Sequence, residues 1–253
     1  MGEENISYLF DVDGTLTLPQ QRMDSSNAWA FLSWMDEKDV YIVAGSGIEK
    51  VEHQIPNSIL KRLEGIFCSM ANEFWVINGK RELIYRNEWK PPIELISDLC
   101  NFQMGSPYPV KKNNYLEQRT GMVNFSVAGR DSNMEERKAY FEWDKEHGER
   151  KKIAAHLSGE YPNIEILIGG QISMDIQPKG KNKSLASKYI RANIGGRMMF
   201  FGDKTQEGGN DYDIAKDIAL CGDGEIFPVT GPSQTLTILE GLESHETNSN
   251  SHR

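Results

Sequence analysis

Two aspartates stand two residues apart at the end of an apolar run near the start of the chain. The segment YLFDVDGTLT, residues 8–17, places Asp11 and Asp13 directly after residues 6–10, whose pattern is typical of a buried strand. One carboxylate of such a pair can attack an electrophilic centre while the other moves a proton as a general acid or base. A tight turn closed by an aspartate side chain is the alternative interpretation without chemistry.

Two familiar loop motifs do not explain these aspartates. A calcium-binding EF-hand loop needs a glycine where Leu16 stands and a bidentate glutamate where Arg22 stands. The dinucleotide-binding pattern G-x-G-x-x-G fits Gly45 and Gly47 of GSGIEK but meets Lys50 in place of its third glycine. The sequence therefore favours neither a calcium loop nor a nicotinamide or flavin site.

A second acidic cluster, FFGDKTQEGGND at residues 200–211, follows another apolar run far along the chain. Oxygen ligands from carboxylates suit Mg²⁺, which is usually held by one or two carboxylates together with substrate phosphate. The five histidines have no ligand spacing. We therefore predict a magnesium site whose candidate ligands are Asp11, Asp13, Asp203 and Asp211.

Short apolar runs separated by helical patterns predict the framework that positions these groups. Runs that end in Gly, Asp or Ser are typical of buried parallel strands, and the alternation predicts a doubly wound α/β sheet. Ligands of such sheets bind beyond the carboxyl ends of the strands, where Asp11 and Asp13 would lie. The predicted strands are residues 6–10, 39–45, 64–70, 197–203 and 225–231.

The middle of the chain has a different pattern, which predicts an inserted α+β domain with an antiparallel sheet. Its strand candidates, residues 82–87, 121–130, 164–170 and 172–178, alternate apolar and polar side chains. Two helices are expected with them, at residues 92–102 and 133–161. We therefore expect a core domain of residues 1–81 and 182–253 and a cap domain of residues 82–181. The polar tail from about residue 243 is expected to be disordered.

Charge and composition exclude several classes of function. A net charge of -9 disfavours binding to nucleic acid, and any phosphate site in so acidic a chain would need its own cluster of arginine and lysine. No apolar run approaches the roughly 20 residues of a membrane-spanning helix, so no membrane partner is expected. The start of the chain lacks the pattern of a signal peptide, and the three scattered cysteines fit reduced thiols, so we expect a cytoplasmic protein.

The motifs and their order resemble the haloacid dehalogenase (HAD) superfamily of phosphotransferases. The D-x-D-G-T loop, Ser46 in VAGSG, Lys183 in GKNKS and the acidic segment GDKTQEGGND match its four motifs in sequence order. The resemblance implies a Rossmann-like core with an inserted cap. It also implies that Asp11 forms an aspartyl phosphate, that Asp13 serves as general acid and base, and that Ser46 and Lys183 bind the phosphoryl group.

The insert is similar to the cap of the eukaryotic-type phosphomannomutases, through RTGMVNFSVAGRDSNMEERKAYFEWD and IGGQISMDIQPKGKNKS. This resemblance implies interconversion of mannose 6-phosphate and mannose 1-phosphate by way of a hexose 1,6-bisphosphate, which also acts as activator. It further implies Mg²⁺, a homodimer formed through the cap and a place in GDP-mannose supply. Residues implied to hold the sugar and its distal phosphate are Arg119, Arg130, Arg137, Ser173 and Asp175.

Three positions depart from the pattern of that family. Gln20 stands where the family usually has an arginine, Gly47 replaces a common acidic residue, and SMANEF differs from the usual Glu-Asn-Gly. The departure at Gln20 favours an alternative on the same scaffold, a sugar-phosphate phosphatase in which water accepts the phosphoryl group. A non-catalytic phosphosugar-binding protein is a third hypothesis, and the intact Asp11 and Asp13 argue against it.

Overall fold

The computed structural model describes residues 5–250 of the chain, without the side chains of residues 244–250. It divides into two compact units, which are described separately below. The first combines Met1–Arg86 with Asn182–Arg253, and the second is Asn87–Lys181. In the described part of the chain, no helix is both long and apolar enough to cross a bilayer.

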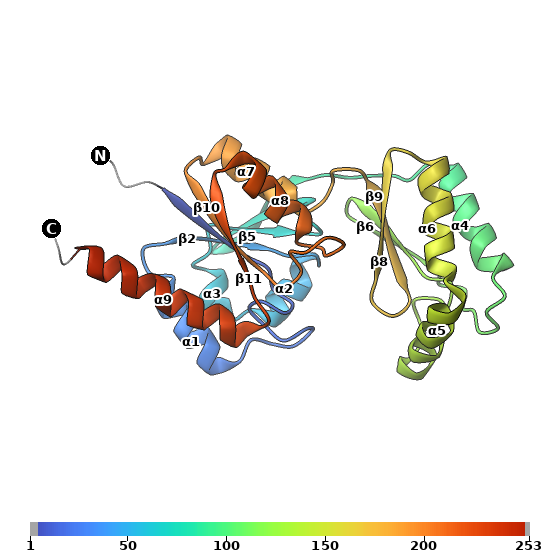
Figure 1. The fold of residues 1–253 in the computed structure, drawn as a ribbon, viewed down its shortest axis with the longest axis horizontal. Helices are drawn as coiled ribbons and strands as arrows, with labels where there is room; N and C mark the ends of the chain where they lie inside the picture. Colours follow the sequence, from blue (N-terminus) through green and yellow to red (C-terminus); the bar gives the residue numbers. More distant parts are fainter. Residues whose placement is uncertain (1–4, 251–253) are drawn as a thin grey trace. The chain divides into compact units, whose positions relative to one another are not determined.

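A seven-stranded sheet forms the centre of the first unit (Figure 1). Its strand order is β11-β10-β1-β2-β3-β4-β5; the strands from β11 to β3 are parallel, and β4 and β5 are antiparallel. The predicted doubly wound α/β core is confirmed. The strands are β1 (Ile6–Phe10), β2 (Asp39–Val43), β3 (Gly65–Cys68), β4 (Glu73–Asn78), β5 (Lys80–Arg86), β10 (Arg197–Gly202) and β11 (Gly224–Pro228).

Helices cover both faces of this sheet because successive side chains of each buried strand point to opposite sides. In β1, Tyr8 and Phe10 enter one apolar cluster and Leu9 enters the other. The first cluster is completed by side chains of α1 (Ser25–Trp34), α2 (Ile48–Gln54), α3 (Asn57–Leu60) and α9 (Pro232–Asn250). The second is completed by α7 (Ser184–Asn193) and α8 (Tyr212–Cys221), which lie on the opposite face in Figure 1.

Two segments differ from the sequence-based expectations for the first unit. Residues 82–87 were expected in the insert, but residues 82–86 belong to β5, which pairs with β4 at the edge of the core sheet. The cause is local: Gly79 adopts a φ of 76°, which permits a tight hairpin between the two strands. Helix α9 enters the tail expected to be disordered, and residues 251–253 lie outside the described range.

The second unit contains a four-stranded antiparallel sheet in the order β6-β7-β9-β8. Its helices contribute to a separate apolar cluster that includes Leu99, Phe125, Tyr140, Leu157 and Ile176. This α+β arrangement confirms the predicted class of the insert. The elements are α4 (Ile93–Gly105), β6 (Leu116–Arg119), β7 (Met122–Phe125), α5 (Met134–His147), α6 (Glu149–Glu160), β8 (Ile164–Gly169) and β9 (Ser173–Pro178).

The single helix expected over residues 133–161 is instead two helices that meet at Gly148. Asn133 and Glu136 form a capping box at the start of α5, and Gly148 ends that helix with a left-handed φ of 63°. Beyond the break, the buried Arg150 binds Asp144 through its Nε at 2.7 Å. Its Nη1 donates to the carbonyls of Gly169, Gly170 and Ser173, which flank the turn between β8 and β9.

Thr235 of α9 provides a test of how the first unit is held together. Its buried hydroxyl donates to the carbonyl of Thr15 at 2.8 Å and so joins the last helix to the loop after β1. Thr235→Val keeps the shape of the side chain but leaves that buried carbonyl without this donor, so we expect the free energy of unfolding to fall by about 1–3 kcal/mol. Urea denaturation measures the change. Thr237→Val removes an exposed hydroxyl of the same helix and should leave stability nearly unchanged.

Candidate functional site

The loop after β1 brings the first two candidate residues to the carboxyl edge of the core sheet. Its turn is closed by the backbone amides of Thr15, Leu16 and Thr17, which all donate to the carbonyl of Val12. Gly14 has a φ of 91°, and a Cβ at this position would overlap the carboxylate of Asp203. A glycine is therefore required for this loop to approach the acidic segment after β10.

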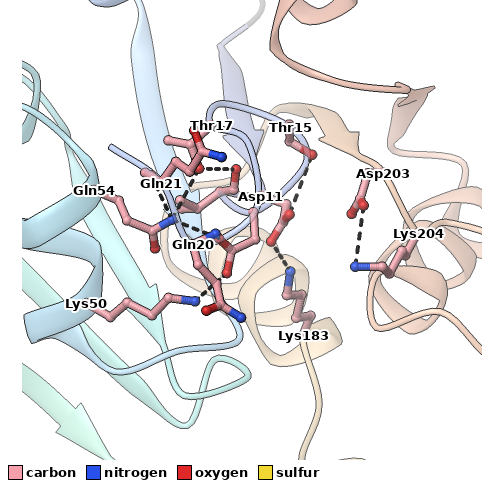
Figure 2. A network of polar contacts seen from close by, with 12 residues as sticks. Asp11, Thr15, Thr17, Gln20, Gln21, Lys50, Gln54, Lys183, Asp203 and Lys204 are labelled. Carbon is pink, nitrogen blue, oxygen red and sulfur yellow. Dashed lines mark hydrogen bonds and ion pairs between the residues drawn. The ribbon is translucent and has the colours of Figure 1, made fainter. Parts of the chain in front are cut away.

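Lys183 is fully buried and contacts two aspartates from different segments of the chain, of which Figure 2 shows Asp11. Its Nζ is 2.5 Å from Oδ1 of Asp11 and 2.7 Å from Oδ1 of Asp211. Burial alone would lower the pKa of the lysine, but the two carboxylates outweigh burial and raise it. Burial also raises the pKa of Asp11, and Lys183 opposes that rise. The lysine therefore supplies a fixed positive charge beside the candidate nucleophile.

Three carboxylates gather around one point beside this lysine. Asp11, Asp203 and Asp211 each offer an oxygen, and these oxygens lie within 4.8 Å of one another. Oδ1 of Asp203 is buried, with no hydrogen-bond partner among the residues that the structure describes. Burial raises the pKa of this aspartate, and Lys204, whose Nζ lies 3.4 Å from Oδ2, only partly opposes the rise. An all-oxygen group with an unpartnered buried oxygen fits a hard divalent cation such as Mg²⁺.

The carboxylate of Asp13 is held apart from those three oxygens. Lys50 Nζ lies 2.5 Å from its Oδ2, and both Gln54 Nε2 and the backbone amide of Gln20 lie 2.7 Å from its Oδ1 (Figure 2). Partial burial would raise the pKa of Asp13, but the hydrogen bond from Lys50 and those from Gln20 and Gln54 leave it below its usual range. In the described part of the chain, the structure therefore does not place this side chain among the candidate metal-binding carboxylates.

Ser46 lies at the same edge of the sheet, after β2, and is half-buried. Its carbonyl accepts a hydrogen bond of 2.8 Å from the amide of Ser69. The cap of α2 is Gly47, so the side chain of Ser46 does not serve as the helix cap. Residues 69–71 have φ values of 53°, 57° and 61°. Three consecutive non-glycine residues in the left-handed region store backbone strain next to Ser46.

Four of the five cap candidates lie together in the second unit. Arg130 Nη1 donates to Ser173 Oγ at 2.7 Å, and Arg119 Nη1 lies 3.9 Å from Oδ1 of Asp175. The two arginines share one acceptor, because Oε2 of Glu117 lies 2.8 Å from a guanidinium nitrogen of each. Charge-assisted hydrogen bonds of this kind fix the orientation of a guanidinium group.

Comparison with known proteins shows to which protein family this chain is similar. The family model described as eukaryotic phosphomannomutase matches residues 30–244, which is well over half of the chain. The chain belongs to the eukaryotic phosphomannomutase family. A phosphomannomutase of Drosophila melanogaster is 33% identical over 222 residues, covering 85% of this chain and 87% of that protein. A phosphomannomutase of Dendrobium officinale is 32% identical over 235 residues and covers 90% of each. The resemblance found in the motifs is confirmed.

Solved structures support the HAD-like fold at much lower identity. A haloacid dehalogenase-like hydrolase from Bacteroides thetaiotaomicron has a TM-score of 0.62 at 13% identity, covering 94% of this chain and 100% of that chain. An IMP-nucleotidase of Plasmodium falciparum has a TM-score of 0.66 at 12% identity, covering 96% and 69%. Similarity at these identities concerns the fold alone, and the predicted HAD-like core with its α+β cap is confirmed.

Arg137, the fifth cap candidate of this phosphomannomutase-family chain, is directed toward backbone. Its Nε donates to the carbonyl of Ser132 and its Nη2 to that of Arg130, each at 2.8 Å. Arg137 therefore supports the loop that carries Arg130. Two acidic residues of the same helix pair with lysines, Glu136 with Lys112 and Glu142 with Lys145.

The sequence-based reasoning missed three polar residues at these two places. Lys50 and Gln54 both bind Asp13, and their spacing of four residues on α2 puts them on one helix face. That spacing, directly after the loop that carries Ser46, could have predicted that both side chains face the candidate site. Glu117 had a weaker signal, because only its place two residues before Arg119 on a strand puts both side chains on the same face.

Magnesium binding provides a test of the three-carboxylate group. We expect Mg²⁺ to raise the melting temperature of the wild-type protein, because a ligand that binds only the folded state stabilises it. Asp203→Asn should remove most of this increase. Glu207→Gln, which neutralises an exposed residue of the same segment, should retain it. Differential scanning fluorimetry with and without Mg²⁺ measures the shift, and equal shifts in all three proteins would contradict the site.

Proposed function

We propose that this protein is a Mg²⁺-dependent phosphomannomutase that interconverts mannose 6-phosphate and mannose 1-phosphate. The observation that carries the proposal is the contact of the buried Lys183 with Asp11 and Asp211, in a member of this family. Beside it lies an oxygen of Asp203 for which residues 5–243 provide no hydrogen-bond partner. Such a site combines a candidate nucleophile with fixed positive charge, which phosphoryl transfer requires.

Asp11 attacks the phosphorus of a hexose phosphate, and the bond from phosphorus to the sugar oxygen breaks. The departing oxygen takes the proton that Asp13 accepted from a sugar hydroxyl in the preceding transfer, and an aspartyl phosphate remains on the protein. The ammonium group of Lys183 offsets negative charge on the transferred group. Mg²⁺, when bound by Asp11, Asp203 and Asp211, would supply further positive charge to the phosphoryl oxygens.

The return step uses the same residues in reverse. Asp13 accepts the proton of an incoming sugar hydroxyl while that oxygen attacks the aspartyl phosphate. The hydrogen bonds that lower the pKa of Asp13 favour its ionised form, which is the form that accepts a proton. Lys50 and Gln54 orient the carboxylate for this transfer. Ser46, at the same sheet edge, is proposed to bind a phosphoryl oxygen.

The cap arginines are proposed to hold the phosphate that is not reacting. Arg119 and Arg130 present guanidinium groups, which match phosphate oxygens in geometry and charge, next to Ser173 and Asp175. Arg137 is proposed to contribute through the loop of Arg130. A hexose 1,6-bisphosphate held in this way exchanges its two ends, which gives the mutase reaction and explains why such a compound would act as activator. A cytoplasmic homodimer that supplies GDP-mannose synthesis completes the proposal.

A sugar-phosphate phosphatase is the second candidate, and one position favours it. Gln20 stands where the family usually has an arginine, and its backbone amide, not its side chain, contacts Asp13. With one cation fewer near the substrate, water could accept the phosphoryl group from Asp11 in place of a sugar hydroxyl. The two candidates share their first step and differ only in the acceptor.

Phosphorus NMR distinguishes the two activities. We expect the protein, supplied with Mg²⁺, mannose 1-phosphate and a catalytic amount of glucose 1,6-bisphosphate, to produce mannose 6-phosphate with little inorganic phosphate. Asp11→Asn should abolish both products, because the amide is not a nucleophile for phosphorus. Release of inorganic phosphate in proportion to the substrate consumed would establish the phosphatase instead. Unchanged turnover by Asp11→Asn would contradict both mechanisms.

A further inference from the structure

Glu117 occupies the guanidinium groups that the proposed function assigns to the distal phosphate. Its Oε2 accepts from Nη2 of Arg119 at 2.8 Å and from Nε of Arg130 at 2.9 Å, and it lies 2.8 Å from Nη2 of Arg130. One carboxylate oxygen therefore meets three donors from two arginines. The hydrogen bond from Arg119 is the main cause that lowers the pKa of Glu117, so the carboxylate remains charged at neutral pH.

Every nitrogen of the Arg130 guanidinium has a partner in this arrangement. Nε and Nη2 contact Glu117, and Nη1 donates to Ser173 Oγ. The edge formed by Nε and Nη2 is the edge that could bind two oxygens of a phosphate group. An incoming phosphate can use this edge only if the carboxylate of Glu117 moves away from it.

The side chains of Arg130 and Glu117 differ in how freely they can move. The Arg130 side chain is 18% exposed, whereas that of Glu117 is 43% exposed. Ser173 therefore holds the less exposed arginine through Nη1, while the carboxylate can rotate into water at small cost. Asp175, the other acid of the cluster, is engaged by Asn124 Nδ2 at 2.5 Å and lies 3.9 Å from Arg119. Glu117 is thus the acid whose movement opens Arg130 to a ligand.

We propose that Glu117 is an exchange ligand of the distal phosphate site, an internal anion that binds Arg119 and Arg130 whenever the phosphate has left. This inference rests on the proposed function. A bisphosphate that must present each of its ends in turn has to leave the arginines in every cycle. Departure is easier when another anion takes over the guanidinium groups, because they are then not left without a partner. Glu117 weakens phosphate binding and in return speeds release.

Glu117→Gln tests the inference because the amide keeps the shape of the side chain and removes its charge. We expect the variant to bind inorganic phosphate roughly fivefold more tightly, the effect of removing one partly exposed charged competitor. Isothermal titration calorimetry of the full chain in Mg²⁺-free buffer measures the affinity. Glu165→Gln is the matched control: Glu165 lies on the same sheet, accepts from Gln177 and should leave phosphate binding unchanged when neutralised.

Steady-state kinetics provide a readout that a purely structural role would not give. With mannose 1-phosphate as substrate, Glu117→Gln should lower KM and kcat together, because tighter binding of the distal phosphate slows its release. A carboxylate that only braces the two arginines would give the opposite sign, with weaker phosphate binding and a higher KM. Unchanged or weaker phosphate binding by Glu117→Gln overturns the inference.

Arg130→Gln separates failure of this inference from failure of the proposed function. If Arg130→Gln binds phosphate more weakly while Glu117→Gln has the phosphate affinity of the wild type, the distal phosphate site is supported and the exchange role of Glu117 is contradicted. If Arg130→Gln binds phosphate as wild type does and turns over mannose 1-phosphate normally, the distal site itself is wrong and both proposals fall.

Discussion

The position of one buried ammonium group determines the arrangement of the core site. Lys183 has no exposed surface, and a charge in such a place is tolerated only when opposite charges compensate the loss of water. Asp11 and Asp211 provide this compensation from segments that follow β1 and β10. Because β1 and β10 are neighbours in the parallel sheet, their carboxyl ends meet at one edge. Sheet order thus brings together charges that lie far apart in the sequence.

The charges of the buried carboxylates at this site are not fully compensated. This incomplete compensation makes the site suited to chemistry. Lys183 forms ion pairs with Asp11 and Asp211, Lys204 lies 3.4 Å from one oxygen of the neighbouring Asp203, and the other oxygen of Asp203 has no hydrogen-bond partner among the described residues. A fold selected only for stability would pair that oxygen or replace its residue. Asp13 contrasts with it, because Lys50, Gln54 and a backbone amide satisfy its carboxylate. The two aspartates of the first motif therefore lie in different electrostatic surroundings although one residue separates them.

The sequence predicted the core well because its signals are local. Buried parallel strands such as β1 and β10 are continuous apolar runs, and the acidic motifs stand directly after them. Features that depend on pairing across the fold were harder to predict. Strand β5 is charged and largely exposed, unlike the buried parallel strands, and only its hairpin with β4 assigns it to the core sheet. The break at Gly148 was hidden within one long charged segment. The contact of Glu117 with Arg130 depends on how a loop folds back, which spacing along the chain does not encode.

The corner between α5 and α6 has a consequence for the arginine cluster. Gly148 lets the chain change direction, and Arg150 then reaches the carbonyl of Ser173, the residue whose hydroxyl receives Nη1 of Arg130. Arg150 thus helps to fix the residue that orients the guanidinium group of Arg130. Inherited variation at this bend would be expected to alter how the protein handles anions while leaving every residue of the two acidic motifs intact.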